Sequence, residues 1–268
     1  MSGWTLTLHT PPRLRMDLQG VLPSGVAEFD GPALARLALR HGNETLALGE
    51  LFRVSARNDD ALVLEGDCSR FDRIGAGLAG GTLRVEGPVG DSLGVQMRGG
   101  TLIVVGSARD GVGCEMAGGR IEVHGNVGDF AAGALPGSLD GMRGGALVVH
   151  GNAGHRFADR MRRGNAVVHG DAGDFLASRL VAGSLLIGGR CGVHPGYGMR
   201  RGSIVFAGAH PEVPPTFMPS AHDLTVFWGL LARELQREGG AFAQLAQRRP
   251  QRHVGDIAVA GKGEWLLV

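Results

Sequence analysis

The sequence predicts an all-β solenoid, a right-handed parallel β-helix of about seven to eight coils with a 19-residue period. Glycine accounts for 47 of the 268 residues without the period of collagen, which indicates many tight turns with positive φ. One glycine recurs at a nearly constant spacing, and apolar residues alternate with polar ones before each recurrence. Segments without the repeat flank it on both sides and are expected to cap the solenoid.

The repeat is defined by the glycine that ends each apolar segment. These glycines are Gly66, Gly87, Gly106, Gly125, Gly151, Gly170, Gly189 and Gly208. The steps between them are 21, 19, 19, 26, 19, 19 and 19 residues. The step of 26 is one period plus seven residues, which predicts an insertion near 133–139. Because one coil cannot bury its own apolar face, successive coils must stack, at a spacing of about 4.8 Å.

Four columns of apolar or small side chains are predicted to face the interior, because residues within each repeat alternate as they do in strands. Two strand columns comprise Leu62/Leu64, Leu83/Val85, Leu102/Val104, Ile121/Val123, Leu147/Val149, Ala166/Val168, Leu185/Ile187 and Ile204/Phe206. The third column is Cys68, Val89, Ala108, Val127, Ala153, Ala172 and Cys191. The fourth is Met97, Met116, Met142, Met161, Leu180 and Met199.

The extent of the repeat divides the chain into three regions. Residues 1–60 are predicted to form an N-terminal cap, residues 61–208 the coils, and residues 209–268 a C-terminal extension. Caps are expected because the open edges of a β-helix invite aggregation unless they are covered.

Each cap is predicted to contain a helix. Residues 32–41 begin with proline and are followed by glycine, which is the usual asymmetry of helix ends. Residues from about 221 to 238 carry an amphipathic apolar pattern that two glycines end. Ser220 and Asp223 resemble a capping box in which Asp replaces Glu or Gln, so the second helix is predicted to begin there.

Composition excludes several classes of function. The formal net charge of +1 argues against a nucleic-acid-binding protein, which usually carries a strongly basic domain. Three cysteines without metal-binding spacing predict neither a disulfide framework nor a zinc site. No apolar run approaches 18 residues and no apolar signal core stands at the start, so we expect no membrane association and a cytoplasmic location.

Three histidines, His124, His150 and His169, occupy one outward column just before the repeat glycine. Stacked about 4.8 Å apart, they would lie close enough to share a metal ion. No carboxylate stands in the same column, and Glu65 and Glu86 lie two or more coils away. We therefore predict no metal site and interpret the column as a solvated or interface ladder.

Two further outward columns have structural interpretations. Aspartates follow the turn in most coils and are predicted to accept backbone N–H groups there, and they are Asp91, Asp110, Asp129 and Asp174, with His155 in their place once. Branched aliphatic residues occupy an outward strand position, where water alone should not cover them, and they are Ile103, Val148, Val167, Leu186 and Val205. Either the helices of the caps or a neighbouring protein chain is expected to cover this second column.

Three stretches carry a family resemblance. Residues 41–54 (HGNETLALGELFRV) precede the first coil, the coils follow G-G-x-[LI]-x-V-x-G-x-x-G, and residues 255–264 (GDIAVAGKGE) stand near the end. Together they resemble the C subunit of formylmethanofuran dehydrogenase over nearly the whole chain. The coils alone are similar to the C-terminal β-helix of glutamate synthase, and the flanking stretches are the specific part.

The resemblance implies a function in one-carbon metabolism. Bacterial relatives of this family belong to the formyltransferase/hydrolase complex, which moves a formyl group from formyl-tetrahydromethanopterin to a methanofuran-type carrier and releases formate. The chemistry is implied to lie on the A and D subunits, so this chain would be a scaffold that associates with the A, B and D subunits and carries no catalytic residue or cofactor of its own. Lys262 is the only lysine, and this arginine bias favours a high-GC bacterium. The alternative is the C subunit of a tungsten or molybdenum formylmethanofuran dehydrogenase.

Arginines form an outward ladder beside the methionine column. They are Arg98, Arg143, Arg162 and Arg200, followed one position later by Arg163 and Arg201. Stacked arginines repel one another, so such a cluster is favoured where anions lie across it. Since the resemblance implies a carrier with a polyglutamate tail, these six residues are candidates for binding that tail. Ion pairs with neighbouring subunits, or simple solvation, are the alternatives.

Two functions outside this class fit the pattern less well. A free-standing β-helix enzyme acting on polysaccharides usually shows acidic residues clustered with basic partners for acid–base catalysis. Here the outward acids fall on turn positions, which disfavours this interpretation. A structural β-helix like that of glutamate synthase is disfavoured by the flanking stretches.

Overall fold

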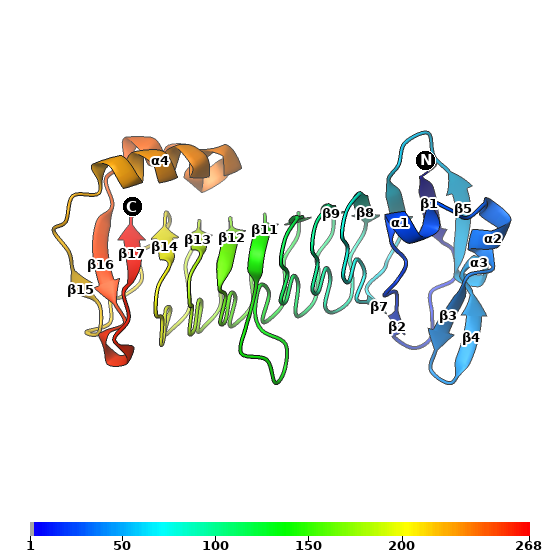
Figure 1. Cartoon of the computed structure of the whole chain (residues 1–268), viewed down its shortest axis with the longest axis horizontal. Coiled ribbons are helices and arrows are strands. Elements are labelled where there is room, and N and C mark those ends of the chain that lie inside the picture. The colour runs from blue at the N-terminus through cyan, green and yellow to red at the C-terminus, as the bar shows by residue number, and fades with distance from the viewer. Residues whose placement is uncertain (1–2) are drawn as a thin grey trace.

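The computed structural model describes residues 3–268 and is mostly β, with few and short helices. Its main feature is one large, mostly parallel sheet whose strands lie side by side along an elongated rod (Figure 1). In spatial order the strands are β15 (Met218–Pro219), β16 (Gln251–Gly255), β17 (Gly263–Leu267), β14 (Ser203–Phe206), β13 (Ser184–Ile187), β12 (Arg163–Val168), β11 (Arg143–Val149), β10 (Arg120–Val123), β9 (Thr101–Val104), β8 (Thr82–Glu86), β6 (Leu62–Glu65), β1 (Trp4–Leu8) and β5 (Phe52–Ala56). This arrangement is consistent with a β-solenoid.

Equivalent positions of successive repeats pair in parallel register. Leu83 of β8 pairs with Leu102 of β9, Leu102 pairs with Ile121 of β10, and Ile121 pairs with Leu147 of β11. A second row of parallel bridges joins the third predicted column from Cys68 through Val89 to Cys191. The apolar column residues therefore stack on one another from coil to coil, as their spacing predicts.

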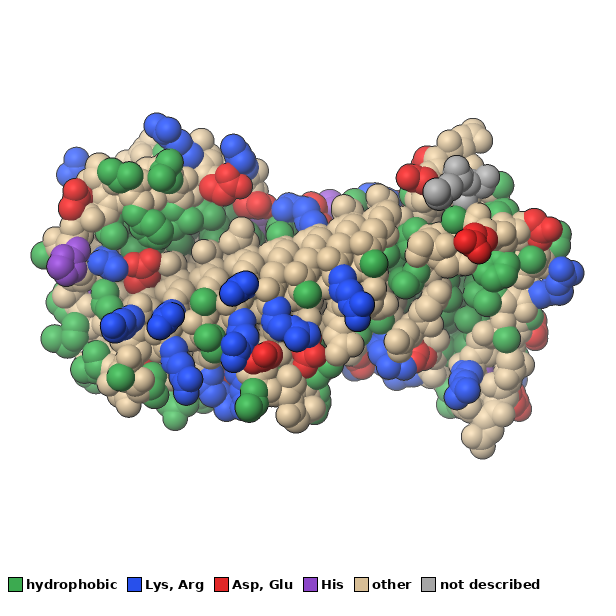
Figure 2. All heavy atoms as spheres, viewed as in Figure 1, with side chains coloured by type: hydrophobic (Ala, Val, Ile, Leu, Met, Phe, Trp, Pro, Cys, Tyr) green, Lys and Arg blue, Asp and Glu red, His purple; other side chains and the backbone are tan. Residues whose placement is uncertain are grey.

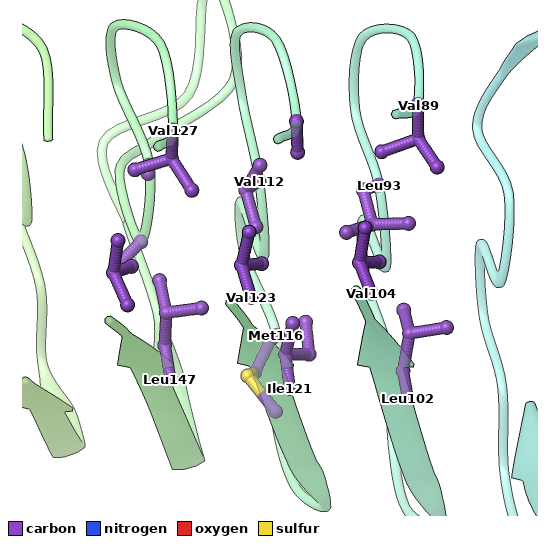
Figure 3. Close-up of a cluster of buried hydrophobic side chains, with 14 of the residues drawn as sticks. Val89, Leu93, Leu102, Val104, Val112, Met116, Ile121, Val123, Val127 and Leu147 are labelled. Carbon is purple, nitrogen blue, oxygen red and sulfur yellow. The ribbon is translucent and has the colours of Figure 1, made fainter. Parts of the chain in front are cut away.

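The interior contains the four predicted columns. Every member is buried except Cys191, which is half-buried, and Figure 3 shows side chains from neighbouring coils meeting inside the rod. A fifth buried column lies in the turns, where sequence alternation gives no signal. It consists of Ile74, Leu93, Val112, Ala131, Phe157 and Leu176. The core is thus wider than the strand pattern alone predicts.

Glycine is required where coils approach closely. Gly100 has a φ of +80°, and a Cβ placed on it would lie 2.6 Å from the carbonyl oxygen of Gly81 in the preceding coil. A Cβ on Gly119 would meet the Gly100 carbonyl oxygen at 2.7 Å. At these positions a larger residue would clash with the neighbouring backbone as well as adopt an unfavourable φ.

The N-terminal region extends the sheet before the first coil. Strand β1 pairs in parallel with β6, and β5 then closes that end in antiparallel register. The region also contains β2 (Met16–Asp17), which pairs with β7 (Phe71–Asp72), the short helices α1 (Pro23–Val26), α2 (Gly31–Ala35) and α3 (Leu48–Leu51), and a hairpin of β3 (Ala38–His41) and β4 (Glu44–Ala47).

The helix predicted over 32–41 is wrong in its second half, where β3 stands in its place. Helix α2 begins with its N-cap Asp30, whose side chain accepts the N–H of Ala33 at 2.7 Å. Residues 42–43 (Gly-Asn) then form the two-residue turn between β3 and β4, with a φ of +62° at the glycine. A two-residue turn of this type favours a hairpin over a helix.

The C-terminal region extends the other end. Strand β17 pairs in parallel with β14, and β16 and β15 follow in antiparallel register. Helix α4 (Thr225–Leu235) lies along the rod and is followed by the 3-10 turns η1 (Gln236–Glu238), η2 (Gly240–Phe242) and η3 (Leu245–Gln247), while η4 (Ile257–Val259) lies between β16 and β17 (Figure 1). None of the helices in residues 3–268 is long and apolar enough to cross a membrane.

The predicted capping box of α4 does not form, and the helix is shorter than the predicted 221–238. Its N-cap is Leu224, and the Asp223 carboxylate accepts hydrogen bonds from both the backbone N–H and the hydroxyl of Thr225. These local bonds hold residue 223 in a turn before the helix, which delays the start of α4.

Candidate functional site

The arginine ladder lies on the surface of the coils. All six predicted residues are exposed, and Arg143 and Arg163 are register partners on β11 and β12. Figure 2 shows blue Lys and Arg side chains gathered over the part of the rod that carries β11 to β14. The structure thus brings like charges together on one face, where repulsion between them favours a bound anion.

Acidic neighbours occupy two members of the ladder. Arg143 lies 3.8 Å from Glu115, and Arg162 forms an ion pair with Asp140 of the insertion loop. The other four, Arg98, Arg163, Arg200 and Arg201, have no acidic partner within ion-pair distance among residues 3–268. These four guanidinium groups therefore stay available to an external anion.

An open hollow of about 680 Å³ lies beside the ladder. Two ladder residues, Arg162 and Arg200, line it together with Arg160, Arg179 and the exposed Tyr197. The buried Asp159 carboxylate lies 3.6 Å from Arg160 and 3.4 Å from Arg179, which neutralises only part of this charge. The buried Asp256 also belongs to the lining, but the guanidinium groups outnumber the carboxylates, so the hollow suits an anionic ligand.

Sequence reasoning missed Arg160 and Arg179. Both stand one position before the methionine column, in turns where φ is +57° and +55° respectively. The 19-residue period relates these two residues, so an alignment of the position before Met161 and Leu180 would have found them.

The histidine column forms the stacked ladder that the sequence predicts. The ring centroids of His124 and His150 are 4.9 Å apart, as are those of His150 and His169. The last ring in the row, His169, packs edge-on against Phe242 of η2 at 5.1 Å. The ladder therefore runs from open surface to the underside of the C-terminal region.

No carboxylate stands in the histidine column itself, but Glu122 reaches the histidines from a neighbouring outward position, which sequence reasoning missed. Glu122 Oε1 lies 2.8 Å from Nε2 of His150 and 3.6 Å from Nε2 of His124. Glu122 precedes His124 by two residues, and alternation along an extended chain puts both on the same face. The signal was present in the sequence, at the outward strand position rather than in the histidine column itself.

Burial and charge set the protonation of this group. Partial burial works to raise the pKa of Glu122, but the hydrogen bond with His150 and the charge of Arg120 hold that pKa below its usual value. Burial, followed by the charge of His150, lowers the pKa of His169. Glu122 is therefore a carboxylate and His169 a neutral imidazole at neutral pH.

The outward apolar column is covered by the chain itself. Val148, Val167, Leu186 and Val205 are buried in a second apolar cluster, in which α4 and the following turns contribute Trp228, Ala232, Leu235, Phe242 and Leu245. Ile103 lies beyond this cluster and stays half-buried. The sequence left two alternatives, a helix of a cap or a neighbouring protein chain, and the structure shows that the C-terminal helix covers the four buried residues.

The aspartate column caps the turns, which confirms its structural interpretation. Asp110 Oδ1 accepts the backbone N–H of Asp129 at 2.9 Å, and Asp129 Oδ1 accepts that of His155 at 2.7 Å. His155 Nδ1 in turn accepts the N–H of Asp174 at 3.0 Å. These side chains are committed to the backbone of the next coil, so they do not form a paired acid and base.

Sequence and structure comparisons agree on one family. A family model described as the GXGXG motif matches residues 70–217. The C subunit of the formyltransferase/hydrolase complex Fhc of Methylorubrum extorquens is 42% identical over 86 residues, 32% of each chain. The C subunit of the tungsten-containing formylmethanofuran dehydrogenase 2 of Methanothermobacter thermautotrophicus is 31% identical over 94 residues, 33% of this chain and 35% of that one. These alignments span about a third of the curated relatives.

A solved structure is similar over a much longer stretch. It is the crystal structure of the formyltransferase/hydrolase complex (FhcABCD) from Methylorubrum extorquens in complex with methylofuran. The match has a TM-score of 0.90 and 39% sequence identity, and it covers 98% of both chains. The chain therefore belongs to the GXGXG motif family and, within it, to the family of the C subunit of the formyltransferase/hydrolase complex.

Proposed function

We propose that the chain is a non-catalytic scaffold subunit of a formyltransferase/hydrolase complex and associates with the A, B and D subunits. The observation that carries the proposal is the structural match to a chain of FhcABCD over 98% of both molecules at 39% identity. That coverage includes both caps as well as the coils. A likeness confined to the repeat would favour a generic β-helix instead.

The proposed reaction of the complex is a two-step transfer. A formyl group passes from formyl-tetrahydromethanopterin to a methanofuran-type carrier, and hydrolysis then releases formate during formaldehyde oxidation. The A and D subunits would perform these steps, while this chain positions them and contacts the carrier without a cofactor of its own.

The side chains of the coils suit a structural role. The turn aspartates are engaged by backbone N–H groups of neighbouring coils. Burial raises the pKa of Cys68 and of Cys114 to about 12, so neither thiol is a thiolate nucleophile near neutral pH. Both observations favour chemistry on other subunits.

The alternative within the family has weaker support. The C subunits of tungsten-containing formylmethanofuran dehydrogenases are 30–31% identical over 94 residues, against 42% over 86 residues for the Methylorubrum relative. A glutamate-synthase-like β-helix would account for the GXGXG match at 70–217 but not for the similarity of the caps. The transferase/hydrolase assignment is therefore preferred.

Co-expression tests the assembly. The A, B and D subunits from the same genome are expressed together with this chain, and the A subunit carries an affinity tag. The purified complex is analysed by native mass spectrometry. The proposal predicts one particle that contains all four proteins. When this chain is left out of the expression, the yield of a complex of the A, B and D subunits should fall. Purification of those three in full yield, with this chain absent from the particle, would contradict it.

We also propose that the ladder of Arg98, Arg143, Arg162, Arg163, Arg200 and Arg201 binds the polyglutamate tail of the carrier. Four of the six lack acidic partners among the described residues, and the arginine-lined hollow lies at the C-terminal end of the row. Each exposed contact is weak and screened over about 8 Å at physiological salt. A tethered tail would nevertheless rebind at high effective concentration, so binding should fall steeply with salt.

Substitution separates tail binding from assembly. Changing Arg163, Arg200 and Arg201 together to Gln should lower the carrier retained per complex, as measured by mass spectrometry, while the four subunits still assemble. The control changes Arg36, Arg40 and Arg53, three exposed arginines of the N-terminal region, to Gln. Equal retention in the two triple variants would overturn tail binding, and loss of assembly in the first would favour ion pairs with neighbouring subunits.

We infer the finer fold and location from the same observations. Register partners such as Leu83 and Leu102 support a 19-residue period, and about seven to eight right-handed coils would span roughly 34–38 Å at about 4.8 Å each. Residues 1–60, 61–208 and 209–268 would then be the cap, coils and extension. Three free cysteines are typical of a reducing compartment, so we propose the cytoplasm.

A further inference from the structure

The group formed by Glu122, His124 and His150 has ligand atoms close enough to share one cation. One carboxylate oxygen and two imidazole nitrogens all lie within 4.8 Å of one another. Zinc holds such ligands at about 2.1 Å, so neighbouring ligand atoms in a tetrahedral site lie about 3.4 Å apart. The separations of 2.8 Å and 3.6 Å from Glu122 to the two histidines bracket that value.

We propose that Glu122, His124 and His150 bind a zinc ion that ties β10 to β11. Two imidazoles and one carboxylate form a donor set that suits zinc, whereas calcium and magnesium prefer oxygen ligands throughout. Three protein ligands leave the fourth position to water. The tie falls at the step of 26 residues, where the seven-residue insertion lengthens the connection between the two paired strands.

Little movement is needed to complete the site. The Glu122 side chain is only 25% exposed and already contacts His150, while the His124 side chain is 47% exposed. Because the His124 ring is exposed, it has room to rotate and bring its Nε2 closer to the other two donors. Zinc would then replace the proton that Glu122 and His150 share in their hydrogen bond.

The surrounding charges favour a cation. Arg120 lies beside the site, with Nε 3.5 Å from Glu122 Oε2, and alone it would repel a metal ion. Glu238 of η1 accepts from the same guanidinium at 3.3 Å and offsets its charge. Two carboxylates and one guanidinium leave one negative charge when the imidazoles are neutral. Arg120 contacts Oε2, so Oε1 stays free to face the histidines.

His169 acts as a positioning residue for the site. Its ring stacks on that of His150 at 4.9 Å with an interplanar angle of 14°, and Phe242 packs edge-on against it at 5.1 Å. This stacking fixes the plane of the His150 ring and hence the direction of its Nε2. The C-terminal region thus orients one ligand through two packed rings.

Zinc titration of the untagged full-length chain tests the proposal. After treatment with a chelator and its removal, calorimetry with zinc chloride should show one saturable site per chain, and zinc should raise the melting temperature. His124→Ala, His150→Ala and Glu122→Gln should each weaken binding at least about tenfold. Because both histidines are exposed, the chain should stay folded, as circular dichroism will verify.

The matched control is His155→Asn. His155 is also exposed and has a carboxylate 3.5 Å away on Asp174, but it lies outside the three-residue group. Asparagine keeps an acceptor for the Asp174 N–H, as Asn126 does for Asn152. This variant should bind zinc like the wild type.

Two results would overturn the site. One is the absence of saturable zinc binding by the wild-type chain, and the other is wild-type affinity in both His124→Ala and His150→Ala. If the variants unfold, the visible spectrum of the wild type with cobalt(II) decides. The intense absorption bands of four-coordinate cobalt would support the site. A spectrum that shows only the weak bands of six-coordinate cobalt would contradict it.

Discussion

At the residue scale, neighbouring positions in a coil differ sharply in how far their side chains are exposed. Val104 is fully buried, whereas the next residue, Val105, is 41% exposed. Val104→Asp should abolish soluble folding or strongly lower the melting temperature, because an unpaired buried carboxylate costs several kcal/mol or must be neutralised. Val105→Asp is the control and should melt within a few degrees of the wild type. Equal melting temperatures for the two variants would disprove the column assignment.

The cysteines provide a second test of the interior. Burial raises the pKa of Cys68 to about 12 and that of the half-buried Cys191 to about 11. Since thiolate is the reactive form, iodoacetamide at pH 8 should alkylate both slowly, and Cys191 before Cys68. Peptide mass spectrometry over a time course measures both rates, with the urea-unfolded chain as reference. Labelling of Cys68 in the native chain as fast as in urea would show that the first coil is open.

Residue-level prediction succeeded where a period was available. The four interior columns follow from a strict repeat of apolar side chains, and burial bears them out apart from Cys191. The fifth column, which includes Leu93 and Phe157, lies in turns with no strand alternation, so only the period itself could have found it. Glu122 was missed because the prediction considered carboxylates only in the register of the histidine column.

At the element scale, α4 determines what the coils expose. Its buried Trp228 lies over the outward apolar column and donates its indole N–H to the Arg248 carbonyl at 2.7 Å. Trp228→Ala should destabilise the docked helix by about 3–5 kcal/mol, because it removes a large buried ring. Phe227→Ala is the control, since that ring is 43% exposed and its loss should cost under about 1 kcal/mol.

Limited proteolysis measures the docking of α4. Trypsin should cleave Trp228→Ala after Arg233 and Arg237 well before the wild type, while the coils stay resistant. Denaturant unfolding gives the free-energy difference in parallel. Similar cleavage rates in Trp228→Ala and Phe227→Ala would mean that the position of α4 does not depend on its packing against the outward apolar column.

Element boundaries were harder to predict than element existence. The amphipathic pattern identified α4, but the local hydrogen bonds of Asp223 delay its start to Thr225. The proline–glycine pattern at 32–41 predicted one helix, whereas the Gly-Asn turn at 42–43 turns the second half into a hairpin. In both cases a short turn segment outweighed the pattern from which the helix was predicted.

At the scale of the whole molecule, both ends of the sheet are closed in the same way. A strand from outside the repeat first continues the parallel register, β1 on β6 and β17 on β14. An antiparallel strand then follows, β5 at one end and β16 at the other. The sequence predicted that caps exist but not this pairing, because register between segments about 60 residues apart leaves no local pattern.

In the proposed role this chain supports catalysis by other subunits and performs none itself. The most direct measurement is formate release from formyl-tetrahydromethanopterin with a methanofuran-type carrier, by the purified chain alone and by the assembled complex. We expect turnover by the complex and none by the chain alone at equal molar concentration. Formate release by the isolated chain, with the A and D subunits shown by mass spectrometry to be absent, would contradict it.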